Sequence, residues 1–185
     1  MRLILLGAPG SGKGTQAEIL AERIGVPSIS TGEMLREAVA AGSELGEEVQ
    51  AILAAGNLVD DVTMADVVRD RLGKSDAQAG FILDGYPRTL GQADTLAGIL
   101  AEKQWSLDAV VYIEVPEDEL IQRSLARQRA DDQEEVIRQR QRVYRRQTQP
   151  LIDHYEATGL LCAVDGHQTI DEVAGSVVAA LEVTS

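Results

Sequence analysis

Cysteine and histidine are scarce in this sequence, which has one cysteine and two histidines among its 185 residues. A single cysteine cannot form an internal disulfide, and no Cys or His lies at the spacing of a metal site, so we expect no structural zinc. Cys162 falls within the apolar run at residues 160–164. We therefore expect it to be a buried strand residue rather than a nucleophile.

Long apolar runs and an excess of basic residues are also lacking. The run at residues 3–6 is too short for a signal peptide, and no segment reaches the ~20 residues of a transmembrane helix. The 30 acidic and 17 basic residues give a net charge of −13, a field that repels nucleic acid and anionic membranes. Since no strongly apolar surface stripe is evident either, we expect a cytosolic monomer without nucleic-acid or membrane partners.

Arginine is concentrated in one segment of this acidic chain. The segment contains Arg123, Arg127, Arg129, Arg138, Arg140, Arg142, Arg145 and Arg146. We expect some of these side chains to face an anionic ligand. A solvated helix face is the more ordinary place for an arginine, and we expect it for Arg138, Arg142, Arg145 and Arg146.

The N-terminal stretch GAPGSGKGTQ, residues 7–16, lies between an apolar run and a helical pattern at residues 16–24. Its G-x-x-x-x-G-K spacing is typical of a phosphate loop, in which glycines let backbone N–H groups turn onto a polyphosphate and the helix N-terminus and Lys13 add positive charge. The hydroxyl is displaced by one place, because Gly14 follows the lysine and Thr15 comes next. A glycine-rich turn with a solvated lysine is the ordinary alternative.

Short apolar runs alternate with helical patterns along the chain, which favours an α/β fold with a parallel sheet covered by helices. We expect strands at residues 3–6, 28–30, 80–85, 109–115 and 160–164. A helical hairpin is expected over residues 31–55, with Thr31 as a helix cap, and Pro150 is expected to kink or restart a helix over residues 134–155.

Asp84 closes the strand expected at residues 80–85. Ligands of open α/β sheets bind at the C-terminal ends of the strands, so we expect this carboxylate to face the phosphate loop. It has the position of a magnesium ligand that acts through water. Capping of a following helix is the alternative role for Asp84.

Five motifs together resemble those of the adenylate kinase family, of the short-lid kind. Beside the phosphate loop they are STGEMLR at residues 30–36, GNLV at 56–59, GYPR at 85–88 and RADD at 129–132. The similarity runs from residue 1 to about residue 180. It implies a three-layer P-loop kinase fold with a five-stranded parallel sheet of order 2-3-1-4-5. The single domain would have a core of residues 1–29, 60–125 and 133–185, a flap that binds the nucleoside monophosphate at 30–59, and a short lid at 126–132.

The resemblance further implies Mg²⁺-dependent, reversible transfer of the terminal phosphoryl group from ATP to AMP, giving two ADP. The residues implied for ATP are Gly10, Ser11, Gly12, Lys13, Gly14, Thr15, Arg123, Arg127 and, through its main chain, Gln168. Those implied for AMP and the transferring group are Thr31, Arg36, Asn57, Leu58, Val59, Gly85, Tyr86, Pro87, Arg88, Gln92, Arg129 and Arg140. The catalytic set would be Lys13, Asp84, Arg88, Arg129 and Arg140, with Asp84 and Thr15 meeting Mg²⁺ through water.

Such a reaction needs cations rather than a general base, because the attacking phosphate oxygen is already an anion. Two other functions stay open at this point. A pyrimidine nucleoside-monophosphate kinase would share the loop and lid but place a different residue where Gln92 meets the base. A GTPase-like nucleotide switch would need a guanine-reading N-K-x-D motif, which the sequence lacks.

Overall fold

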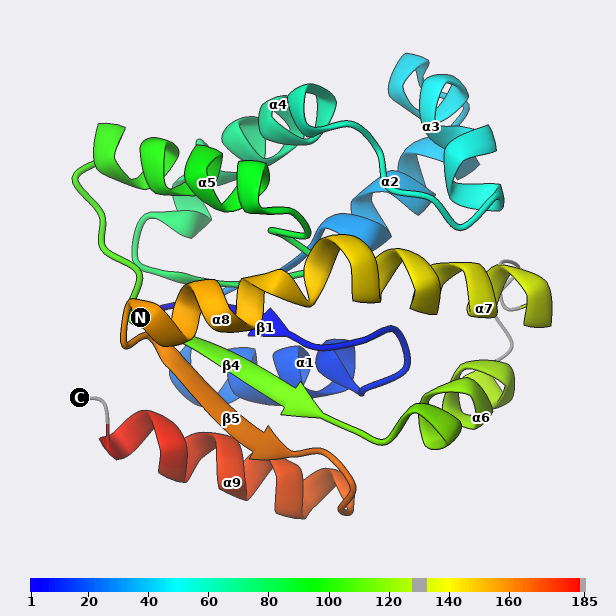
Figure 1. The fold of residues 1–185 in the computed structure, drawn as a ribbon. Helices are drawn as coiled ribbons and strands as arrows, with labels where there is room; N and C mark the ends of the chain where they lie inside the picture. Colours follow the sequence, from blue (N-terminus) through cyan, green and yellow to red (C-terminus); the bar gives the residue numbers. More distant parts are fainter. Residues whose placement is uncertain (128–132, 184–185) are drawn as a thin grey trace.

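A computed structural model describes residues 1–127 and 133–183, with the side chain of Val183 left out. Its centre is a five-stranded sheet of order β2-β3-β1-β4-β5 (Figure 1), in which every pairing is parallel. The strands are β1 Arg2–Leu6, β2 Ser28–Ser30, β3 Phe81–Asp84, β4 Ala109–Glu114 and β5 Leu161–Asp165. The strand number, direction and order expected from the sequence are confirmed.

The helices lie between the strands, close to the positions that the apolar periodicity predicts. They are α1 Lys13–Ile24, α2 Thr31–Ala40, α3 Glu44–Ala54, α4 Asp61–Leu72, α5 Leu90–Glu102, α6 Glu117–Arg127, α7 Glu134–Val143, α8 Pro150–Ala157 and α9 Ile170–Val183, with a 3₁₀ turn at Ser75–Ala77. None of the helices in the described part of the chain has both the length and the apolar character to cross a membrane.

Alternate side chains of the strands point to opposite faces of the sheet, and each face has its own helices. Ile4 and Leu6 pack in a buried cluster with residues of α4, α5 and α8. Leu3 and Leu5 pack in a second cluster with residues of α1 and α9. The result is a three-layer structure, with the two sets of helices on either side of the sheet (Figure 1). Cys162 is buried in β5, as expected.

Pro150 interrupts the long helix at residues 134–157, as its sequence predicts. It is the first residue of α8, and the chain before it widens into a π-helix at Tyr144–Thr148. A proline has no N–H to donate and its ring crowds the carbonyl four residues earlier, so a regular α-helix cannot continue through it. The wider turn is marked by the bond from Gln149 N to Tyr144 O, at 2.9 Å.

The helical hairpin α2–α3 stands beside the sheet (Figure 1). Ser43 begins α3 by accepting a hydrogen bond from Gly46 N, at 3.1 Å. The two helices are so close here that a Cβ at Gly46 would overlap the carbonyl oxygen of Ala38. The expected capping role of Thr31 is wrong: Ser30 precedes the first helical residue, and the Thr31 hydroxyl instead donates to Gly85 O at 3.0 Å.

Candidate active site

A cleft of about 550 Å³ lies at the C-terminal ends of the central strands. Leu6, Ser30 and Asp84, which end β1, β2 and β3, line its floor. The phosphate loop forms one side, the hairpin α2–α3 with residues 56–59 forms another, and α7 contributes to a third. This is the edge of an open α/β sheet where ligands are expected to bind.

The phosphate loop turns tightly between β1 and α1. Gly12 precedes α1 with φ +93°, and no side chain caps the helix there. Gly10 has φ +91°, and a Cβ at that position would lie 2.5 Å from Leu120 O. Both positions therefore require glycine. The uncapped N–H groups at the start of α1 border the cleft, and a helix N-terminus of this kind favours a nearby anion.

The Lys13 side chain folds back over the phosphate loop. Its Nζ donates to Gly7 O at 2.8 Å and to Ala8 O at 2.9 Å, and lies 3.4 Å from Ser11 Oγ. These carbonyl contacts hold the ammonium group at the loop, beside the N-terminus of α1. The full charge of the lysine and the partial charge of the helix thus act on the same part of the cleft.

Asp84 faces the phosphate loop, as expected from its place at the end of β3. Its Oδ2 accepts from Ser30 Oγ at 3.2 Å, and a Cβ at Gly14 would lie 3.8 Å from the same oxygen. The alternative capping role is wrong, because Thr89 caps α5 by accepting from the N–H of Gln92. Asp84 and the Thr15 hydroxyl both border the cleft. One carboxylate with neutral oxygens suits Mg²⁺, which completes its shell with phosphates and water.

No group of three or more His, Cys, Asp and Glu side chains is placed to hold a metal ion anywhere in residues 1–127 and 133–183. A metal at Asp84 would therefore take most of its ligands from a nucleotide and from water. The donor chemistry of the cleft fits Mg²⁺ accompanying a polyphosphate better than a metal held by protein ligands alone.

Two arginines converge on the opposite side of the cleft. A Cβ at Gly32 would lie 3.2 Å from Arg36 Nη1 and 3.6 Å from Arg88 Nη2. Burial lowers the pKa of Arg88, the Asp84 carboxylate opposes this, and the charge of Arg36 adds to the lowering. Arg88 Nε is held by Gly85 O at 2.7 Å. Two guanidinium groups this close in a partly desolvated site gain stability when an anion such as a phosphate lies between them.

Gln92 lies at the far end of this side of the cleft and is 2% exposed. Its Oε1 accepts from the backbone N–H of Arg88 at 2.8 Å, and its Nε2 donates to Asp61 Oδ1 at 2.8 Å. Thr31, which is 1% exposed, lines the same cleft. The expected base-reading residue is therefore in place, but it is already bonded to two groups of the protein.

The wall near α6 and α9 carries the residues expected at the ATP adenine. Arg123 donates to Gly166 O at 2.9 Å and pairs with Glu119, which also contacts His167. Gln168 borders the cleft, and its side chain lies 3.4 Å from Asp165 Oδ2. The contacts among α6 and residues 165–168 fix the loop that would meet the base.

The cleft brings together nearly all of the expected site residues. Those that line it are Gly10, Ser11, Gly12, Lys13, Gly14, Thr15, Thr31, Arg36, Asn57, Leu58, Val59, Asp84, Gly85, Pro87, Arg88, Gln92, Arg123, Arg127, Arg140 and Gln168. Tyr86 is not among the residues that line the cleft, and its contact with the ligand stays a prediction. Its side chain is 1% exposed and packs in the hydrophobic core, where burial, with a smaller effect of Asp61, raises its pKa to about 12. Arg129 lies outside the described residues.

Three residues that support the cleft were not expected. Gln141, on α7, donates to Pro9 O at 2.8 Å. Thr148, in the π-helix, donates to Arg88 O at 2.8 Å. Asp61 binds Gln92, as described. The spacing Thr89-x-x-Gln92 resembles a capping box, which predicts a bond from the Gln92 side chain back to the helix start. The bond is made with Arg88 N, one residue before the cap, and no local pattern indicates the other contacts.

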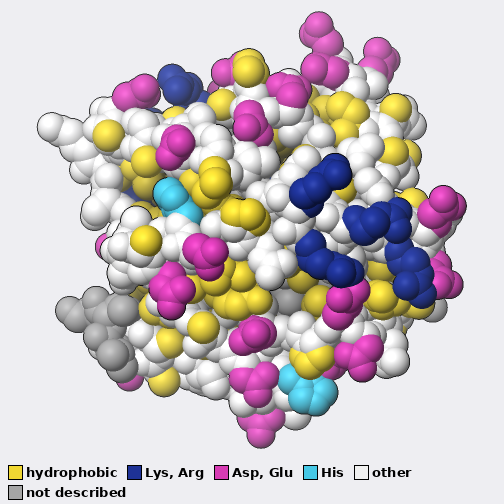
Figure 2. Space-filling model, viewed as in Figure 1, with side chains coloured by type: hydrophobic (Ala, Val, Ile, Leu, Met, Phe, Trp, Pro, Cys, Tyr) yellow, Lys and Arg dark blue, Asp and Glu magenta, His cyan; other side chains and the backbone are white. Residues whose placement is uncertain are grey.

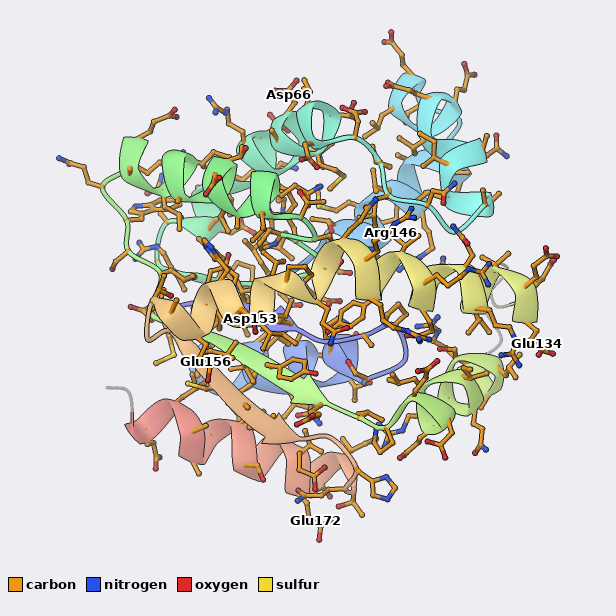
Figure 3. The ribbon with its side chains drawn as sticks, viewed as in Figure 1. Asp66, Glu134, Arg146, Asp153, Glu156 and Glu172 are labelled. Atoms are coloured by element: carbon orange, nitrogen blue, oxygen red, sulfur yellow. The ribbon has the colours of Figure 1, made fainter. Side chains whose placement is uncertain are left out.

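The remaining arginines of the basic segment are exposed, as expected. Arg138, Arg142, Arg145 and Arg146 are exposed on α7 and the π-helix. Figure 2 shows basic side chains gathered on this part of the surface. Glu134 lies at the start of α7 (Figure 3). Arg138 pairs with it at 2.8 Å, and both side chains are more than half exposed. Surface pairs of this kind contribute little to stability.

Comparison with known proteins gives consistent relatives over nearly the whole chain. The model of the family described as adenylate kinase matches residues 5–160. The chain is 51% identical over 173 residues to the adenylate kinase of Nocardia farcinica, covering 94% of both chains. It is 48% identical over 186 residues to that of Stenotrophomonas maltophilia, covering 98% of this chain and all of the relative. It is 43% identical over 213 residues to that of Thermodesulfovibrio yellowstonii, covering 98% and 99%.

Proposed function

The chain belongs to the adenylate kinase family, and from this premise we propose how its cleft carries out the reaction. The enzyme transfers the terminal phosphoryl group of ATP to AMP reversibly, giving two ADP. ATP lies along the phosphate loop, and AMP lies on the side of Arg36 and Arg88. The transferred group passes between the two nucleotides. Monomeric, cytosolic action without nucleic-acid or membrane partners belongs to the same proposal.

The ATP half is supported by the uncapped start of α1 and by Lys13. Backbone N–H groups of residues 10–15 hold the phosphates, since they border the cleft without a side-chain cap. Lys13 leaves its carbonyl partners to follow the β and γ phosphates. The adenine lies near Arg123, Arg127 and the main chain of Gln168, which line the other end of this half.

The AMP half is supported by the convergence of Arg36 and Arg88 beside Gly32. Their guanidinium groups bind the α-phosphate of AMP. Residues 56–59, 85 and 87, together with Thr31, surround the nucleoside, and Gln92 meets the base. The side chain of Tyr86 packs in the core, so a contact of this residue with the ligand would be made by its main chain.

The chemistry follows from charge and position. The attacking oxygen of AMP needs no deprotonation, so no general base is required. Arg88, Arg140 and Lys13 neutralise the charge that spreads over the transferring group, and Arg129 of the lid completes this set. When Mg²⁺ is bound with ATP at Asp84 and Thr15, it supplies further neutralisation of the phosphates.

Water is the competing acceptor in such a site, so the site has to close. Residues 30–59 and the lid at residues 126–132 close over AMP and ATP, respectively, and exclude bulk water. The hairpin α2–α3 is suited to this motion because it stands beside the sheet (Figure 1).

One observation carries the proposal: the phosphate loop with Lys13 and the arginine pair Arg36 and Arg88 line one continuous cleft. The test is coupled ADP production with ATP and each of AMP, CMP, UMP and GMP. AMP should be preferred by at least ~10²-fold in kcat/KM, the discrimination that unpaired buried polar groups can give. Comparable rates with CMP or UMP would favour a pyrimidine kinase. ATP consumption that ignores the acceptor would indicate an ATPase or a switch.

A further inference from the structure

A closed set of hydrogen bonds fixes the side chain of Gln92. Its Nε2 donates to Asp61 Oδ1 at 2.8 Å. Its backbone N–H donates to Thr89 Oγ1 at 3.1 Å, and that hydroxyl lies 3.2 and 3.1 Å from Asp61 Oδ1 and Oδ2. Its Oε1 accepts from Arg88 N. The first residue of α4 is thereby tied to the first turn of α5.

The backbone N–H of Arg88 and the carboxylate of Asp61 together allow the Gln92 side-chain amide only one orientation. The backbone N–H of Arg88 can only donate, so it requires the oxygen of Gln92 on its side. The carboxylate of Asp61 can only accept, so it requires the nitrogen on the other side. A primary amide has four hydrogen-bonding positions, and two are used here. One N–H and one oxygen lone pair remain for a ligand in the cleft.

The remaining pair of positions matches adenine. Adenine presents a ring-nitrogen acceptor, N1, beside an amino donor, N6, and needs a donor and an acceptor in return. Hypoxanthine has the same ring size but presents an N1–H donor beside an oxygen acceptor. It would pair with the amide only after a rotation by half a turn, which would set N–H against N–H at Arg88 and oxygen against oxygen at Asp61.

Asp61 is not the residue that caps its own helix, so its carboxylate can bind Gln92. Asp60 caps α4, accepting from Val62 N and Thr63 N at 3.0 Å each. Gly91 provides the room, since a Cβ there would lie 2.9 Å from Asp61 Oδ2. The carboxylate also lies at the N-terminus of α5, where the helix dipole favours a negative charge.

We propose that Asp61 is a positioning residue that locks the amide orientation of Gln92 and so sets the preference of the acceptor site for a 6-amino purine over a 6-oxo purine. This inference rests on the proposed contact between Gln92 and the base of AMP. Asp61 itself does not touch the ligand in this scheme; it selects which edge of the amide the ligand meets.

The test compares kcat/KM for AMP and for IMP at saturating ATP in each variant. Asp61→Ala should lower the AMP:IMP ratio by at least about tenfold, within the range that a single misplaced polar contact can give. Asp61→Asn offers a donor as well as an acceptor, so it can pair with either orientation of the Gln92 amide and should also lower the ratio. Since kcat/KM for AMP and kcat/KM for IMP are measured on the same sample, the fraction of folded enzyme cancels from their ratio.

Two further variants separate orientation from loss of charge or of fold. Gly91→Ala keeps the carboxylate but displaces it, and should lower the ratio in the same direction. Asp66→Ala removes a carboxylate from the outer side of α4 (Figure 3) and should leave the ratio unchanged. Equal losses with AMP and IMP in Asp61→Ala would mean that Asp61 only supports the fold, and would overturn the inference.

Gln92→Leu separates the role of Asp61 from the proposed contact between Gln92 and the base of AMP. If this variant loses the AMP:IMP preference and Asp61→Ala keeps it, Gln92 reads the base but Asp61 does not orient it, and the inference is wrong. If Gln92→Leu itself keeps the preference, the base contact of Gln92 is wrong and the inference falls with it. In the Gln92→Leu background, adding Asp61→Ala should cause no further change in the ratio.

Discussion

The side-chain amide of Gln141 donates to the carbonyl oxygen of Pro9 across an N···O distance of 2.8 Å. Gln141 is 3% exposed and lies on α7, whereas Pro9 lies in the phosphate loop. The bond joins residues 132 positions apart in the sequence. Helix α7 therefore supports the loop that holds the ATP phosphates and, through Arg140, also reaches the cleft.

Gln141→Leu should weaken ATP binding because it removes this support. We expect KM for ATP to rise about three- to tenfold, the net worth of one neutral hydrogen bond, with KM for AMP little changed. Steady-state kinetics with each substrate varied in turn measures both. Arg138→Ala, on the exposed face of the same helix, is the control. A lower melting temperature with unchanged KM for ATP would mean that Gln141 only stabilises the fold.

Lys13→Met should lower kcat by at least ~10²-fold, since one preorganised charge at the transferring group is lost. Its contacts to Gly7 O and Ala8 O are partly buried bonds within the loop and do not join it to the core, so the fold should persist. Circular dichroism checks the fold and coupled ADP production checks the rate. The exposed Lys74→Met is the matched control. Near-normal turnover of Lys13→Met would remove the assignment of the phosphate loop.

Gly46→Ala should disturb the flap, because the new Cβ would overlap the backbone carbonyl of Ala38. Overpacking of this kind costs about 1–3 kcal/mol, and we expect a raised KM for AMP as α2 and α3 separate.

Gly98→Ala is the opposite case: Gly98 is exposed within α5 with nothing near its Cβ position. It should raise the free energy of unfolding by about 0.5–1 kcal/mol. Chemical denaturation measures the free energy of unfolding of each variant, and steady-state kinetics measures KM for AMP. A Gly46→Ala variant with unchanged stability would contradict the close approach of α2 and α3.

The parts of this structure that the sequence could predict are those that depend on local pattern. Apolar periodicity placed the helices and strands, because burial of one face imposes it within each element. The place of Asp84 beside the phosphate loop followed from topology, since parallel strands end at one edge of the sheet. The order of the strands came only from the family resemblance, because periodicity does not say which strands pair.

The contacts that the sequence could not predict join distant segments. Gln141 and Thr148 reach the loops from a helix that Pro150 distorts, and the register of that distortion decides where they point. Asp61 meets Gln92 only because α4 and α5 lie side by side. Tyr86 belongs to the signature motif, yet its side chain packs in the core while Gly85, Pro87 and Arg88 line the cleft.

The cap of α4 should make stability depend on pH in a defined direction. Hydrogen bonds from Thr63 and Val62 lower the pKa of Asp60 below its ordinary value of 3.8, against a smaller opposing effect of desolvation. A carboxylate with a depressed folded-state pKa contributes stability that is present above its unfolded pKa and is lost as the pH falls through the folded one. Asp60→Ala should therefore lower the melting temperature near neutral pH, and the difference should shrink below pH 3.8. A melting-temperature difference that stays constant with pH would contradict the charged cap. For the control Asp66→Ala, the melting-temperature difference should not change with pH.

The two halves of the cleft are close enough for one ligand to span both. Lys13 and Arg88 line one space of about 550 Å³, and the proposed reaction requires both nucleotides to occupy it at once. A single molecule with two adenosines joined by a chain of phosphates would bring its second half to the site as an intramolecular event. It should bind at least ~10²-fold more tightly than ATP or AMP, as linkage without new contacts can provide.

A polyphosphate chain of the same length with only one adenosine is the matched control for that experiment, because it keeps the charge and loses the second base. Calorimetry should show tighter binding of the two-adenosine compound than of this control. Gln92→Leu should reduce that difference, since the second adenine would lose its amide partner on the AMP side. If the two-adenosine compound binds no better than ATP, the two nucleotide sites do not converge on one transferred group, and the proposed arrangement of the cleft is wrong.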